Sequence, residues 1–212
     1  YNFISNHYES AVSIHLPNSS SGTYQSALTA SRSISKFPIT VVDSSNASIG
    51  LGLIALSAAE SVNAGKDINE VTSAVDHAVK NTKVFLGLES LDNIVKGGRI
   101  SKRVKKLANL LRINPILSFD RLGTLKPIGV TFGNNNKSEK FKKYVEKRIP
   151  IDKHIRIGIA HAKMDKFVEC WSVELKKKYG EHNVIIAEMG PALAVHSGPG
   201  GLVFSIQTFS GE

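Results

Sequence analysis

The sequence predicts a two-lobed α/β protein, with a mostly parallel sheet in the first lobe, a mixed sheet with helices in the second, and a ligand cleft between them. Two observations lead to this fold class. Short apolar segments rich in β-branched residues alternate with longer segments of helical periodicity. The chain also has 212 residues, of which 42% are hydrophobic. This length suits one large domain or two small ones that share a cleft.

The first part of the chain alternates between strands and helices. In order, we expect a strand at 9–16, a helix at 22–34, a strand at 39–44, a nearly all-apolar helix at 47–65, a helix at 68–81 and a strand at 83–89. Gly65 is typical of a helix end. Asp67 and Glu70 form a capping-box pattern for the helix that follows. This order implies a mostly parallel sheet with both faces covered.

The second part has a different character. We expect a short helix at 90–95 that ends before Gly97 and Gly98, and then a basic helix at 102–112 with Ser101 as its N-cap. A hairpin over 114–132, which turns at 120–123, is followed by a helix at 138–148. The chain then continues with a strand–helix–strand unit over 154–190 and a glycine turn that leads into a last strand ending at 209. The lobes are therefore predicted as residues 1–81, the remainder of an N-terminal lobe whose start is missing, and 82–212.

Composition narrows the class of protein. A single cysteine, Cys170, excludes an internal disulfide and fits a reducing, cytoplasmic location; beside Trp171 on an amphipathic helix, it is expected in the core. No signal peptide or membrane-spanning run is visible. The net charge of +9 comes from basic clusters on three predicted helices. We interpret these clusters as the solvent-exposed faces of the helices. A nucleic-acid surface would require those helices to share one face, and we expect no nucleic-acid partner.

Hydroxyl side chains gather where the first strand leads into the first long helix. Ser20, Ser21, Gly22 and Thr23 lie at this junction. Helix N-termini have unpaired N–H groups and a positive dipole end, which together favour an anion. A simple N-cap accounts for one of these serines and leaves the others unexplained. The segment is not a P-loop, because no lysine follows the glycine at the required place.

Two further segments carry candidate ligand-binding groups. His196 and Ser197 begin a glycine-rich turn, where the histidine can donate to an oxyanion or act as a base; a capping histidine is the simpler reading. Arg99 follows two glycines, and its guanidinium can pair with a carboxylate or phosphate, or lie on a surface connection. The histidines lack metal-ligand spacing. A G-x-S-x-G nucleophile elbow is absent.

Five blocks in this order resemble the DegV family of bacterial lipid-binding proteins: "SSSGTYQSALTA", "VVDSSNASIGLG", "LESLDNIVKGGRIS", "INPILSFDRLGTL" and "MGPALAVHSGPGGL". The resemblance covers nearly the whole chain. It implies a two-lobed protein that holds one long-chain fatty acid between its lobes and presents the carboxylate to a separate ATP-binding fatty acid kinase subunit. It also implies a further N-terminal segment that precedes the first residue here.

Carried over by position, the resemblance makes Ser21 the loop ligand of the carboxylate, His196 the second contact, and Arg99 a head-group or kinase-facing residue. With Ser20, Gly22, Thr23 and Ser197, these are the expected ligand-binding residues; no catalytic residue, metal or cofactor is expected. Three alternatives stay open. Ser21, His196 and Arg99 could form a phosphoryl- or acyl-transferase site, the chain could be a truncated member without lipid binding, or the basic helices could make transient contact with a membrane surface.

Overall fold

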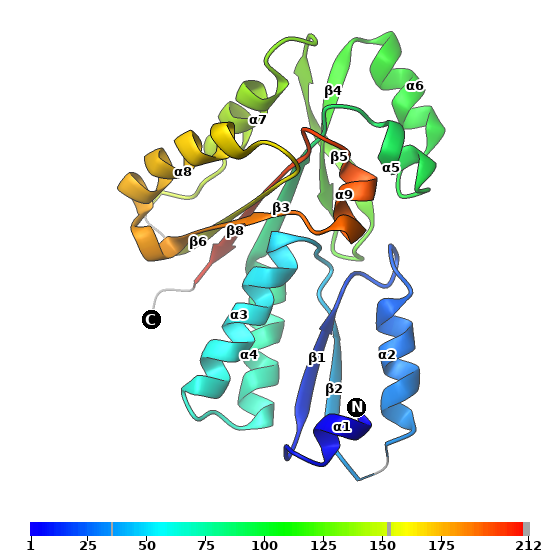
Figure 1. The fold of residues 1–212 in the computed structure, drawn as a ribbon, viewed down its shortest axis with the longest axis vertical. Coiled ribbons are helices and arrows are strands. Elements are labelled where there is room, and N and C mark those ends of the chain that lie inside the picture. Colours follow the sequence, from blue (N-terminus) through cyan, green and yellow to red (C-terminus); the bar gives the residue numbers. More distant parts are fainter. Residues whose placement is uncertain (35, 152–153, 210–212) are drawn as a thin grey trace.

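The computed structural model describes residues 1–34, 36–151 and 154–209, which form two sheets flanked by helices (Figure 1). In the smaller sheet, β1 (Ala11–His15) pairs in parallel with β2 (Ile39–Asp43). The elements around it are α1 (Asn2–Ser5), α2 (Thr23–Arg32), α3 (Ile49–Asn63) and α4 (Ile68–Asn81). Val42, Ile54 and Val75 belong to the small core that these elements enclose. This part has the parallel pairing predicted for the first lobe.

The larger sheet has six strands in the order β5-β4-β3-β8-β6-β7. Its strands are β3 (Thr82–Gly87), β4 (Ile113–Phe119), β5 (Leu125–Phe132), β6 (Ile155–His161), β7 (Val184–Glu188) and β8 (Leu202–Thr208). Only β6 and β7 pair in parallel among these described strands, which makes the sheet mixed, as predicted. The strand predicted at 83–89 joins this second sheet as β3, antiparallel to β4 and β8, and not the first one.

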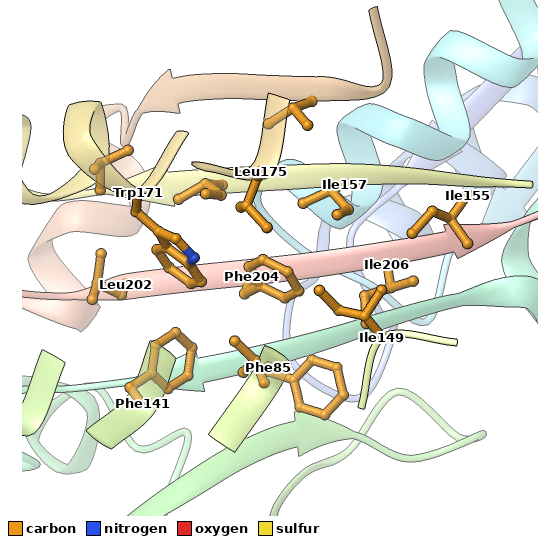
Figure 2. Close-up of a cluster of buried hydrophobic side chains, with 14 of the residues drawn as sticks. Phe85, Phe141, Ile149, Ile155, Ile157, Trp171, Leu175, Leu202, Phe204 and Ile206 are labelled. Carbon is orange, nitrogen blue, oxygen red and sulfur yellow. The ribbon is translucent and has the colours of Figure 1, made fainter. Parts of the chain in front are cut away.

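One face of the larger sheet carries the main hydrophobic core. Helices α7 (Lys137–Glu146) and α8 (Asp165–Tyr179) cover this face. Figure 2 shows Trp171 of α8 lying over Phe204 of β8; the two rings are stacked with centroids 5.1 Å apart. Because side chains alternate along a strand, Phe85 of β3 enters this core, whereas its neighbours Val84 and Leu86 point to the opposite face.

The opposite face of the sheet is covered by α5 (Asp92–Lys96), α6 (Lys102–Leu110), α9 (Pro191–Ser197) and the N-terminal end of α3. Figure 1 shows α7 and α8 on one side of the sheet and α5, α6 and α9 on the other. The basic helices α6, α7 and α8 are therefore divided between two faces. Helices α7 and α8 share one face and α6 lies on the other, so the three do not share a single face; the absence of a nucleic-acid partner stays a prediction.

Several local expectations are confirmed and others are corrected. The Asp67–Glu70 capping box is present, and Gly65 has a positive φ just after α3. Ser101 holds the N-cap position of α6, but its side chain makes no cap hydrogen bond within the described chain. Cys170 is exposed, because it lies on the outer side of α8 while Trp171 turns inward. The boundary between residues 81 and 82 stays a prediction.

Candidate functional site

The loop after β1, residues 16–22, is the polar segment singled out from the sequence, and we call it the serine loop. It joins β1 to α2 and contacts the second lobe. The hydroxyls of Ser19 and Ser20 both donate to the carbonyl oxygen of Gly123, at 2.6 and 3.1 Å. Gly123 lies in the tight turn between β4 and β5, about one hundred positions later in the chain. Two of the three serines therefore fasten the first lobe to the hairpin of the second.

The third serine has a different partner. The Ser21 hydroxyl donates to the Thr23 hydroxyl at 3.2 Å and accepts the Thr23 backbone N–H at 3.3 Å. Since each hydroxyl carries one proton, this pair keeps one O–H donor available. Ser21 is half-buried and Thr23, the first residue of α2, is exposed. The pair thus offers a hydroxyl donor at a helix N-terminus.

The loop after β2 lies beside the serine loop, because parallel strands end at the same edge of their sheet. Asp43 holds the two loops together: its carboxylate accepts the backbone N–H groups of Asn18 at 3.0 Å and of Ser45 at 2.7 Å. The first turns of the described helices α2 and α3 contain no acidic side chain. Two positive helix ends therefore lie at this edge without a carboxylate in their first turns.

His196 lies in the last turn of α9, a seven-residue helix that was not predicted from the sequence. Its imidazole packs on Gly97: a Cβ built on that glycine would lie 2.7 Å from Cε1 of His196 and closer still to Nδ1. Burial lowers the pKa of His196, and the nearby Arg99 charge lowers it further. Neither ring nitrogen has a hydrogen-bond partner among the described residues, and Nδ1 is the ring nitrogen that lies against Gly97.

Arg99 links the second lobe to the serine loop. Its Nε donates to the backbone carbonyl of Ser20 at 3.3 Å, and one terminal nitrogen donates to the carbonyl of Gly97 at 2.5 Å. The glycine pair before it makes this possible, since Gly98 adopts a φ of +77° at the end of α5. The guanidinium stays exposed but is held over the junction between the lobes.

These groups surround one apolar cavity of about 530 Å³ between the lobes. The first lobe contributes the serine loop and the N-terminal end of α3. The second contributes the face of the sheet opposite the main core, together with α5, Arg99 and α9. The cavity is lined by Leu16, Pro17, Ser20, Ser21, Thr23, Ala47, Ser48, Leu51, Val84, Leu86, Leu88, Ile94, Arg99, Phe119, Leu125, Met189, Ala192, Leu193, His196, Ser197 and Val203.

The structure brings most of the predicted site residues to this cavity. Of the seven, Gly22 does not line it and instead precedes α2 at the N-cap position. The Ser197 hydroxyl donates to the Gly198 carbonyl at 3.2 Å, and that of Ser20 donates to Gly123, so their hydrogen atoms are already engaged. Ser21, Thr23, Arg99 and His196 are the predicted residues with groups directed to the lobe junction. Their role in binding stays a prediction.

The apolar wall and Ser48 were not predicted from the sequence. Val84 and Leu86 of β3 and Val203 of β8 line the cavity, and the alternation along β3 could have assigned its two residues to one face. Ser48 precedes α3 directly, which is an N-cap position and a recognisable signal. That these segments form one wall could not be seen locally, because they are far apart in the chain.

The same geometry bears on the alternative functions. The Ser21 hydroxyl donates to Thr23 and not to His196, so among the described residues lining the cavity Ser21 and His196 do not form the serine–histidine pair that activates a nucleophile. The described residues include no group of three or more metal-ligating side chains. No helix among them is long and apolar enough to cross a membrane.

Comparison with known proteins identifies relatives along nearly the whole chain. The matching family model is described as "Uncharacterised protein, DegV family" and covers residues 1–208. A DegV domain-containing protein of Staphylococcus aureus is 32% identical over 195 residues, which are 90% of this chain and 68% of that protein. A fatty acid-binding protein of Thermotoga maritima is 32% identical over 202 residues, or 94% of this chain and 69% of that protein.

A solved structure extends this similarity to the fold. The chain superimposes on the structure of a fatty acid-binding DegV family protein from Thermus thermophilus with a TM-score of 0.84 at 25% sequence identity. The match covers 99% of this chain and 74% of that protein. The arrangement of the two sheets is therefore shared with a solved relative.

Proposed function

The chain belongs to the DegV family, and we propose that it binds one long-chain fatty acid in the cavity between its lobes. The observation that carries this proposal is the division of the cavity into an apolar wall and a polar end. Leucine, isoleucine, valine, phenylalanine and methionine side chains form the wall, and Ser21, Thr23, Arg99 and His196 lie around the polar end. An amphiphile with one anionic group and an unbranched chain has this distribution of polarity.

Simple energetics agree with tight binding. Burying a chain of about fifteen methylenes gains roughly 0.8 kcal/mol for each, or ~12 kcal/mol before costs. Association and ordering subtract several kcal/mol. In the proposed complex the carboxylate accepts charge-assisted hydrogen bonds from the Ser21–Thr23 pair and from His196, near the positive end of α2.

The test is native mass spectrometry of the purified chain, followed by lipid extraction and titration with hexadecanoic acid. We expect one fatty acid for each chain. His196→Ala removes a donor to a charged group worth about 1.5–3 kcal/mol and should weaken binding roughly 10- to 100-fold. Ser21→Ala removes one hydroxyl of the Ser21–Thr23 pair that faces the head group and should also weaken binding. Ser26→Ala, an exposed position on the same helix as Thr23, is the matched control. A wild-type chain that stays empty when hexadecanoic acid is supplied contradicts the proposal.

We further propose that the bound acid is presented to a separate ATP-binding kinase subunit. In that reaction a carboxylate oxygen attacks the γ-phosphorus of ATP and ADP leaves, which yields an acyl phosphate. Support comes from the position of the head-group residues at the lobe junction, where Thr23 is exposed and a second protein can approach. Hydroxylamine trapping of the acyl phosphate, with and without the kinase subunit, tests this step. A product formed from ATP by this chain alone would assign the chemistry to the chain itself.

A further inference from the structure

Ser48 is the unusual polar residue of the cavity. Its hydroxyl oxygen is buried and has no hydrogen-bond partner, and it is the only buried side-chain nitrogen or oxygen without one in residues 1–34, 36–151 and 154–209. Buried hydroxyls are normally paired, because leaving one unpaired forfeits the hydrogen bonds it makes in water. Ser48 also lines the cavity between the lobes. An unpaired group in a cavity wall suggests a partner that arrives with the ligand.

The backbone of Ser48 is strained. Its φ of +55° and ψ of −137° lie outside the regions that residues with a side chain ordinarily adopt. The preceding loop holds this conformation: the Ser44 hydroxyl donates to the Asn46 carbonyl at 2.8 Å, and the Asn46 side chain donates to the Ser44 carbonyl at 3.0 Å. Ser44 and Asn46 are both buried. Strain that is enforced by its surroundings is characteristic of functional positions.

Electrostatics indicates which part of a ligand Ser48 would meet. The residue precedes α3, a fifteen-residue helix whose first turn has no acidic side chain. The loop that carries it lies beside the serine loop, joined to it through Asp43. The positive ends of α2 and α3 thus lie at the same edge of the small sheet. The negative end of the ligand belongs there.

We propose that Ser48 is an additional head-group ligand, whose hydroxyl turns about its Cα–Cβ bond to donate to the carboxylate of the bound acid. Since no partner holds the hydroxyl, the rotation breaks no hydrogen bond. The proposal rests on the fatty acid binding proposed above. It predicts that Ser48 recognises the acid group and not the hydrocarbon chain.

The experiment compares hexadecanoic acid with its methyl ester by displacement of a fluorescent fatty acid. Two variants remove the hydroxyl: Ser48→Ala keeps a side chain at the positive φ, and Ser48→Gly relieves the strain. Ser61→Ala is the matched control, a buried serine on the same helix that does not line the cavity. Thermal melting of the empty proteins is measured in parallel, because a purely structural serine would lower the melting temperature when it is removed.

We expect both variants to bind the acid about 10-fold more weakly and the ester about as well as the wild type, with an unchanged or higher melting temperature when empty. Acid affinity within twofold of the wild type overturns the role of Ser48. An equal loss for acid and ester also overturns it and assigns Ser48 to the shape of the cavity. If the wild type binds neither compound, the proposed fatty acid binding itself fails. If the wild type binds the acid and the Ser48 variants bind it equally well, only the role of Ser48 fails.

Discussion

Replacing Gly97 with alanine tests whether the position of His196 controls ligand binding. A Cβ at residue 97 would lie 2.7 Å from Cε1 of the imidazole, whereas non-bonded carbons settle at about 3.5–4.0 Å. The ring must therefore move by about 1 Å. A hydrogen bond of about 2.8 Å stretched by that amount exceeds the usual limit for such a bond. Since a bond to a charged group contributes about 1.5–3 kcal/mol, we expect binding of hexadecanoic acid to weaken roughly 10- to 100-fold.

The backbone of Gly97 makes this variant specific. Its φ of −68° and ψ of −10° suit alanine, and Gly→Ala at a compatible position stabilises by about 0.4–1 kcal/mol through the unfolded state. The melting temperature should thus change little while affinity falls. Gly190→Ala is the matched control, because a Cβ there meets nothing within 4 Å and its φ is −64°.

The assay is fluorescent fatty acid displacement with a double-mutant cycle. If Gly97→Ala acts through the imidazole, then Gly97→Ala combined with His196→Ala binds no more weakly than His196→Ala alone. Two results refute the reasoning: affinity of the Gly97 variant within twofold of the wild type, or losses in the two variants that simply add.

Three further predictions concern stability. Gly123→Ala should lower the free energy of unfolding, measured in urea melts, by about 1–3 kcal/mol more than Gly65→Ala does. Both glycines have a positive φ, but only a Cβ at Gly123 would collide with the serine loop. Equal losses in the two variants would contradict the contact between the lobes. Gln207→Leu should cost at least about 1–3 kcal/mol, because the buried amide donates to a main-chain carbonyl of α3 at 3.3 Å and to a threonine hydroxyl at 3.2 Å; an unchanged urea midpoint argues against it. Burial lowers the pKa of His15 and His196 in the folded state, so the unfolded chain takes up protons first. The stabilising contribution of the two neutral histidines should therefore be complete above about pH 6.5 and be lost as the pH falls through their lowered folded-state pKa values. If the melting temperatures of the His15→Ala and His196→Ala variants depend on pH as steeply as that of the wild type, these residues are not responsible.

Local sequence patterns were sufficient for the order and type of most elements. Strand segments such as 155–161 are short and β-branched, and α4 has a capping box at its start and an apolar stripe along its fourteen residues. The hairpin turn around Asp120 was equally local, because the carboxylate accepts the N–H groups of Leu122 and Thr124 at 2.9 Å. Short helix α9 was missed, because its seven residues lie between glycine- and proline-rich turns and give little periodicity.

The amino-acid sequence specifies which polar groups are present: the hydroxyls of the serine loop, the histidine at 196 and the arginine after two glycines. The partner of each group follows from the packing of the two lobes. Ser19 and Ser20 donate hydrogen bonds to Gly123, Ser21 donates to Thr23, and His196 packs against Gly97. The physical reason is distance along the chain. Helix and strand propensities act within a few residues, whereas these contacts form only when the two lobes pack and a hydrogen bond between remote segments repays the entropy of bringing them together.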